Sequence, residues 1–237
     1  MDLRRSLHDD VRMCIRNLIE AELVNNVNLP DFDAWSVGKP HEIEKSSRYT
    51  TRFLNIYNSR GYLMTLFDNS MILASYKFEQ RAKKKFRVVK CSLSYWPNPG
   101  LGVSPTDGLD RLEDDEETEI TIAAALINDD YAFSSNYIRL DYDLNSYREI
   151  LHPSGHIHVG ANNDLRLAID RILSVSEFVD MILYLYYQKH WLDRLPHTSD
   201  GAVDLQQYIE QRRKLKMTWT MPTALSPLEV EHYLVRL

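Results

Sequence analysis

The spacing of the apolar residues changes near residue 60, and this change constrains the fold more than any other feature of the sequence. Between residues 62 and 96 apolar residues alternate with polar ones, which is the period of a β-strand. Asp68 and Asn69 interrupt the pattern with a dipeptide typical of tight turns. Successive strands joined by short turns form a meander, so the sequence predicts an antiparallel sheet.

The same reasoning places the expected strands and their connections. Strands are predicted at residues 62–67, 71–78, 86–96, 120–127, 136–143, 156–159 and 165–169. In the third of these, Val89, Cys91 and Leu93 are expected to share the apolar face. Basic residues 80–85 are expected to form a connection. Residues 97–119, which include an acidic run at 113–117, are expected to form a long irregular loop.

Segments with a period near 3.6 residues flank the predicted sheet. Helices are predicted at residues 6–24, 46–58, 174–192, 203–216 and from Pro227 onward, with residues 28–45 as a loop. Ser6 is the expected N-cap of the first helix. Ser174 and Glu177 have the spacing of a capping box. The basic end of the 203–216 helix is a candidate binding surface.

These elements predict one α+β domain. Its 237 residues suit a single domain, 1–237, with a helical part at 1–58, a sheet of about five to seven strands at 60–170, and a helical part at 174–237. The net charge of -6 argues against a dominant nonspecific grip on nucleic acid. Two separated cysteines indicate buried thiols, and with no signal peptide or membrane segment in view we expect a cytoplasmic protein.

Three of the eight histidines fall within seven residues and form the most distinctive local pattern, at positions His152, His156 and His158. Pro153 and Gly155 predict a turn at the start of this stretch. A strand is expected to follow the turn. His152 is then expected at the rim of any site that the other two histidines form.

Alternation along that strand decides which residues lie together. Ile157 and Val159 are expected to face the core, while His156 and His158 share the other face. Alternate Cα atoms on a strand lie about 6.6–7 Å apart. Both imidazoles can therefore reach one ligand.

A second polar stretch precedes the histidines. Within residues 138–144, Arg139, Asp141 and Asp143 alternate with apolar residues and share one face. If this strand pairs antiparallel with the histidine strand across residues 144–155, these three side chains and the two histidines line one face of the sheet.

Carboxylates beside histidines support three kinds of chemistry. They can bind a divalent metal such as Zn, Mn or Fe, or tune an imidazole for acid–base work. With Arg139, Arg166 and the lysines at 83–85 they can bind phosphate. Two simpler alternatives stay open: structural histidines, and Asp141 and Asp143 as surface charges of an edge strand. The metal is left unassigned, with a metal-free site as the first expectation and a divalent metal as the alternative.

Several segments also occur in a recognisable order. They are residues 67–78, Leu93 to Pro99, Tyr142-Asp143, His152 to Gly160, then Asn163, Arg166 and the helix opening at 174–185. In this order they resemble a family of uncharacterised bacterial proteins, a domain of unknown function with a His-Pro-x-x-His-x-His-x-Gly stretch. The resemblance covers residues 45–190 and carries no activity. It implies a bacterial origin and the kind of orphan family found in defence or toxin–antitoxin loci.

Two functions follow as hypotheses. The first is an RNase-like effector that acts on phosphodiesters, with a catalytic group of His156, His158 and His152 and a substrate-binding group of Arg139, Asp141, Asp143 and Arg166. The second is a non-enzymatic subunit of a bacterial defence assembly that binds protein or nucleic acid through the basic 203–216 helix and the 97–119 loop. Neither hypothesis involves a membrane.

Overall fold

The described part of the chain folds around one antiparallel sheet. The computed structural model describes residues 3–29, 36–37, 48–82, 85–100, 136–161, 166–218, 223 and 225–232. Within this part, eight strands form the sheet in the order β1-β3-β4-β5-β6-β7-β8, and β2 pairs with β4. Their bounds are β1 (Val24–Val27), β2 (Ser36–Val37), β3 (Met64–Leu66), β4 (Met71–Ala82), β5 (Lys85–Trp96), β6 (Ile138–Asp143), β7 (Gly155–Val159) and β8 (Leu167–Ala168). The predicted antiparallel α+β meander is confirmed.

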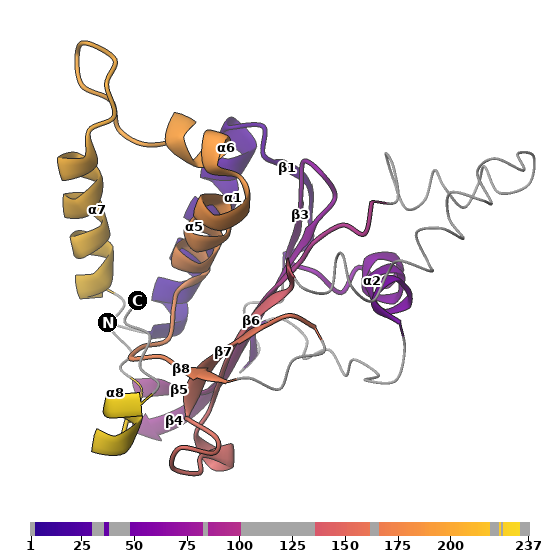
Figure 1. Ribbon diagram of the computed structural model, residues 1–237, viewed down its shortest axis with the longest axis vertical. Helices are drawn as coiled ribbons and strands as arrows, with labels where there is room; N and C mark the ends of the chain where they lie inside the picture. The colour runs from indigo at the N-terminus through magenta and orange to yellow at the C-terminus, as the bar shows by residue number, and fades with distance from the viewer. Residues whose placement is uncertain are drawn as a thin grey trace, which may run out of the picture.

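Helices lie on both faces of the sheet. Figure 1 shows α1 and α5 together over one face and α2 on the opposite side. The helical elements are α1 (Leu3–Glu20), α2 (Tyr49–Asn58), the 3₁₀ turn η2 (Leu144–Ser146), α5 (Val175–Tyr186), α6 (Gln188–Asp193), α7 (Leu205–Thr218) and α8 (Pro227–His232). None of the helices in the described ranges is long and apolar enough to cross a membrane.

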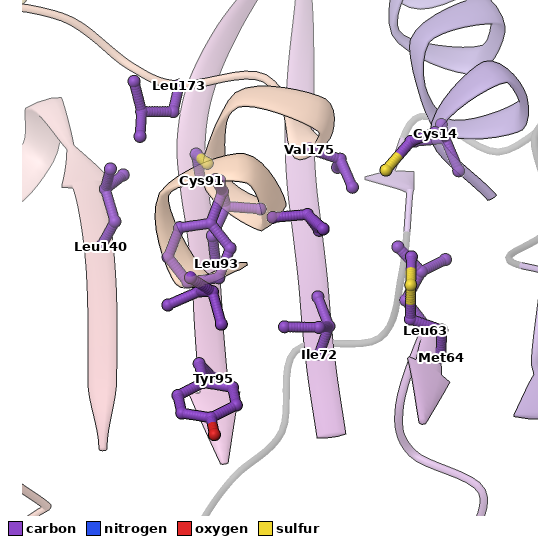
Figure 2. Packing of buried hydrophobic residues seen from close by; sticks show 14 of the residues in the cluster. Cys14, Leu63, Met64, Ile72, Cys91, Leu93, Tyr95, Leu140, Leu173 and Val175 are labelled. Carbon is purple, nitrogen blue, oxygen red and sulfur yellow. The ribbon is translucent and has the colours of Figure 1, made fainter. Parts of the chain in front are cut away.

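A separate core fills the space on each side of the sheet. The larger core joins α1 and α5 to the sheet, and Figure 2 shows Cys14, Ile72, Leu93 and Leu140 converging there. The smaller core joins α2 to the other face and contains Tyr49, Phe53, Met71, Leu73, Trp96 and Tyr137. Cys14 and Cys91 are free and buried, as predicted. The larger core makes one face of the central strands apolar. The smaller core leaves the other face with both apolar and polar side chains.

The first helix begins and ends earlier than predicted. It starts by Leu3, which packs on the core one turn before Leu7, so Ser6 lies inside the helix and is not its N-cap. Glu22 adopts φ 56° and the amide of Leu23 donates to the carbonyl of Leu18. This hydrogen bond is the helix-ending pattern in which a left-handed residue closes the last turn. The chain is thereby free to form β1, which the helical prediction missed.

The structure also corrects the predicted strands at three other places. Val88 and not Val89 is buried in β5, because the ladder pairs Lys77 with Lys90 and then Phe78 with Val88. Val89 is the extra residue of this β-bulge, which inverts the alternation beyond it. β4 and β5 continue to Ala82 and Lys85, so the strands occupy much of the expected 80–85 connection. Ser36 and Val37 form β2 within the predicted loop.

The predicted 174–192 helix is two helices. The capping box at Ser174 and Glu177 is confirmed at the start of α5. Tyr187 leaves the helical conformation, with φ -132° and ψ 48°, and separates α5 from α6. Its hydroxyl donates to Asp68 Oδ2 over 2.6 Å and lies 2.8 Å from the hydroxyl of Tyr95. These bonds tie the α5–α6 junction to the β3–β4 turn.

The remaining sequence predictions divide between confirmed elements and undescribed residues. The 46–58 and 203–216 helices correspond to α2 and α7, and Pro227 opens α8. The acidic run at 113–117, the 120–127 strand and Lys83–Lys84 lie outside the described residues.

Candidate functional site

The two polar stretches predicted to meet do meet. β6 and β7 pair antiparallel, with Arg139 opposite His158 and Asp141 opposite His156. β6 also pairs with β5 on its other side, so it is an interior strand and not the edge strand that a surface role for its aspartates assumed. Because β6 is hydrogen-bonded to β5 on one side and to β7 on the other, both neighbours fix the register of these side chains.

The site lies on the sheet face that also carries α2. Leu140 and Ile157 point into the larger core under α1 and α5. Their strand neighbours Arg139, Asp141, His156 and His158 therefore point to the other face. Val159 was expected in the core but is 38% exposed at the end of β7. Because β7 ends at Val159, this side chain lacks the packing that buries Ile157.

Asp141 is the centre of the cluster. Its Oδ2 accepts a hydrogen bond from Arg139 Nε over 2.6 Å and lies 3.6 Å from His158 Nε2 and 4.0 Å from His156 Nε2. Its Oδ1 accepts from the hydroxyl of Ser92 over 2.8 Å. Ser92 is the β5 residue directly opposite Asp141. The carboxylate is thus oriented by one neighbouring strand and faces the histidines on the other.

The preceding turn fixes the ring of His156. Its Nδ1 lies 2.9 Å from the carbonyl oxygen of Pro153, three residues earlier. A carbonyl only accepts, so Nδ1 carries the proton and donates. In the neutral ring Nε2 is then left with its lone pair. This lone pair is on the side of Asp141, as the distance above shows.

Both strand histidines are buried and uncharged at neutral pH. His156 is 1% exposed and His158 is 5% exposed. Burial lowers the pKa of His158 to about 4, and the positive charge of Arg139 adds to the effect. Burial also lowers the pKa of His156. The two rings meet edge to face, with centroids 4.8 Å apart.

His152 joins this pair from the loop that connects β6 to β7. Its ring lies edge-on to that of His156, with centroids 4.9 Å apart. Its Nδ1 is buried and has no hydrogen-bond partner within the described residues. Backbone hydrogen bonds run in both directions between Arg148 and His152 and close the loop. The three predicted histidines therefore form one contiguous cluster.

The other two predicted residues differ in their placement. Arg166 is near enough that its charge lowers the pKa of both His156 and His158. Asp143 lies one step further along β6, where it pairs with Lys90 over 3.4 Å and accepts from the backbone amide of Asn145. These contacts of Asp143 belong to a cap at the end of β6 and not to the histidine cluster.

Support for the loop comes from a segment that the sequence did not connect to it. Glu229 of α8 is fully buried and accepts from the backbone amide of Ile150 over 3.2 Å. Ile150 has φ 63°, which is unusual for a β-branched residue and needs such support. Thr223 donates to the carbonyl of Ile169 and packs on Gly155, where a Cβ would overlap its methyl group. The C-terminal segment therefore supports the loop before His152 and the first residue of β7.

Two further residues of the site had weak sequence signals. Ser92 was recognised only as a polar position in an alternating strand. Tyr137 contacts Arg139, and its pKa is raised to about 12, mainly by burial. Both were identifiable as neighbours only once the register of β5 and β6 was known.

Comparison with known proteins places the chain in a family. Residues 31–224 match the family model described as "Uncharacterized conserved protein (DUF2290)", and the chain belongs to this family. The match covers β2 to α7 and the whole histidine cluster, a wider range than the 45–190 resemblance. No curated protein and no solved structure matches the chain.

Proposed function

We propose that the cluster on β6 and β7 acts on phosphodiesters, in the manner of an RNase-like hydrolase. The observation that carries this proposal is the gathering of Arg139, Asp141, His156 and His158 on one face, with the charge of Arg166 close by. Two guanidinium groups beside neutral imidazoles suit an anionic ligand. A phosphate ester is such a ligand.

Each group has a role that follows from its state. Arg139 is the more accessible part of the cluster, with a side chain 33% exposed, and would bind a phosphate oxygen. His156 and His158 are uncharged near pH 7, so they offer lone pairs rather than protons. In a hydrolysis they can take the proton of an attacking hydroxyl or bind a metal, whereas the proton for the leaving oxygen must come from water or another donor.

The cellular location and biological role of this activity are a separate proposal. A bacterial cytoplasm and a role as a defence or toxin-type effector are supported only by the resemblance to orphan bacterial families. The test of a setting is genetic: expression of the wild type in a bacterial host slows growth or blocks phage, and expression of a His158→Ala variant at the same level does not. Equal phenotypes for both would remove this setting.

The activity itself is tested on defined substrates. Wild-type protein is incubated with labelled single-stranded RNA, double-stranded RNA, single-stranded DNA and a chromogenic phosphodiester, each with added Zn²⁺, with added Mn²⁺, and with chelator. We expect cleavage of at least one substrate, a loss of about 100-fold or more in His158→Ala, and no loss in His190→Gln. His190 is in α6 and packs on Phe67, whereas the cluster lies on β6 and β7. No cleavage by the folded wild type on the full set would contradict the proposal.

A second candidate function is a non-enzymatic subunit of a defence assembly. The observation that favours it is a set of exposed apolar side chains on consecutive helices: Tyr184, Leu185, Leu192, Leu205 and Ile209. Exposed apolar side chains on α5, α6 and α7 suit contact with another protein. This reading predicts that Leu185→Lys or Leu192→Lys abolishes a co-purifying partner without changing the fold, and a strictly monomeric, partner-free protein in its native host would contradict it. The 97–119 loop and the basic end of α7, both expected as binding surfaces, are largely outside the side chains described.

A further inference from the structure

We propose that Asp141, His156 and His158 are the protein ligands of a divalent first-row transition metal, of the zinc, iron or manganese kind. The proposal reverses the first expectation from the sequence, which favoured a metal-free site. The role of the metal in phosphodiester hydrolysis rests on the proposed function, whereas its binding rests on the geometry alone.

The spacing of the three side chains suits one ion. Each of them offers one ligand atom, and these three atoms lie within 4.8 Å of one another. Such a cluster can hold a metal ion. With metal–ligand bonds of about 2.0–2.2 Å, ligand atoms around one ion sit about 3–3.5 Å apart. The 3.6 Å separation of Asp141 Oδ2 from His158 Nε2 lies at the upper end of this range, and the 4.0 Å separation from His156 Nε2 exceeds it by about 0.5 Å. Small side-chain rotations close the set.

The same distances show that Asp141 forms no direct hydrogen bond with His156 or His158. Histidine–carboxylate hydrogen bonds require about 2.7–3.2 Å between heavy atoms, and both contacts are longer. Nε2 of His156 is an acceptor because Nδ1 holds the proton, and Asp141 is an acceptor as well. Two acceptors that face each other in a largely buried site are suited to hold a cation between them.

The surrounding hydrogen bonds match those around known kinds of metal ligand. A histidine ligand commonly donates its other ring N–H to a carbonyl or carboxylate, as His156 does to Pro153. A ligating carboxylate is commonly hydrogen-bonded at its second oxygen, as Asp141 is by Ser92. Both bonds fix the orientation of the ligands before any ion arrives.

Two histidines and one carboxylate leave coordination positions open. Ligands from two adjacent strands occupy one side of the ion, so the other side is available for water or substrate. His152 lies beside His156, and its buried Nδ1 is a candidate for an additional contact. We therefore expect a catalytic type of centre rather than a closed structural one.

Charge decides the class of ligand that the open side takes. A divalent ion and Arg139 together outweigh the single carboxylate of Asp141, and the charge of Arg166 adds to the excess. Arg139 and the ion can share Asp141 Oδ2, because a carboxylate oxygen has two lone pairs. The surplus positive charge is relieved by an anion, and a phosphate group fits both the metal and the guanidinium.

Direct titration tests the site without reference to activity. The full chain is stripped with chelator and titrated with Co²⁺ followed by absorption, with Zn²⁺ followed by calorimetry, and with Mn²⁺ followed by broadening of assigned histidine ring signals. We expect one equivalent to bind and the signals of His156 and His158 to broaden while those of His190 and His197 stay sharp. Broadening in the wild type locates the ion even if variants misfold.

Matched variants then assign the ligands. Asp141→Asn and His158→Gln are expected to lower the affinity for Co²⁺ by about 100-fold or more, whereas Asp143→Asn and His190→Gln stay within about threefold of wild type. Circular dichroism and thermal melts confirm that each variant is folded. Failure of the wild type to bind any of the three ions, or equal affinity in folded Asp141→Asn, overturns the site. Binding with no nuclease activity would leave the metal site standing and remove the proposed function, and cleavage by a protein that binds none of the three ions would do the reverse.

Discussion

Asp141 and His156 are direct partners in the antiparallel ladder of β6 and β7, and the Oδ2 of one lies 4.0 Å from the Nε2 of the other. On its opposite side Asp141 is the direct partner of Ser92 in β5. Three adjacent interior strands thus determine how the carboxylate faces the imidazoles. A site of this kind depends on register, because a slip of one residue would move each of these side chains to the other face.

Removal of the Ser92 hydroxyl is expected to weaken metal binding without unfolding the protein. Ser92→Ala deletes the donor to Asp141 Oδ1, so the carboxylate can turn away from the histidines. We expect about a tenfold loss of Co²⁺ affinity, and recovery in Ser92→Thr. Ser75→Ala is the matched control, since Ser75 pairs with Ser92 one strand further from the site. Equal losses in both alanine variants would show that Ser92 acts only through general packing.

A methyl group at position 155 is expected to destabilise the fold. In Gly155→Ala the new Cβ would overlap the methyl group of Thr223 and come within 3.1 Å of Ile169 Cγ1. Overpacking of this kind costs about 1–3 kcal/mol, measured by urea denaturation. Thr223→Ser removes the obstructing methyl group and keeps the hydroxyl that bonds Ile169. The double variant should recover part of the loss, and strictly additive effects of the two changes would contradict the contact.

The buried ion pair at the start of α5 gives a larger effect. Arg171 Nη1 lies 2.8 Å and 2.9 Å from the two carboxylate oxygens of Glu177, and both side chains are buried. Glu177→Ala leaves a buried guanidinium without its carboxylate and should cost about 3–5 kcal/mol. Arg171→Met combined with Glu177→Leu should cost clearly less, because neither charge remains. The free energies of unfolding at pH 7 compare the variants, and a loss below about 1 kcal/mol for Glu177→Ala contradicts the pairing.

Stability is expected to fall at alkaline pH. Burial raises the pKa of Cys14 from 9.0 to about 12 and that of Tyr137 from 10.0 to about 12. The unfolded chain releases these protons first, so their contribution is complete below pH 9 and is lost as the pH rises toward about 12. Urea midpoints at pH 8, 9.5 and 10.5 should therefore decline, and the decline should be smaller in Cys14→Ala. A flat profile would contradict the burial of both groups.

The sequence was sufficient to predict the sheet. Antiparallel pairing of the two strands that build the site was a condition of the predicted site, and the ladder of β6 and β7 meets it. Alternation placed Arg139 and Asp141 on one face of their strand and the two histidines on one face of theirs. These are local signals with a period of two residues. They also predicted the capping box at Ser174, because that motif lies within four consecutive residues.

Features that depend on distant contacts were not predictable in this way. The bulge at Val89 has no local signal, since Val88 and Val89 are equally apolar. Support of the histidine loop by Glu229 and Thr223 joins segments about 70–80 residues apart, and only the folded chain brings them together. Burial of the histidines, which lowers the pKa of both rings, also had no local signal in the sequence.

Anomalous diffraction tests the central claim most directly. Crystals grown with Zn²⁺ or Mn²⁺ would be measured on both sides of the absorption edge of the metal. The account predicts one strong anomalous peak about 2.0–2.3 Å from Asp141 Oδ2, His156 Nε2 and His158 Nε2. Well-ordered density for all three side chains with no peak between them, in crystals that contain the metal elsewhere, would contradict it.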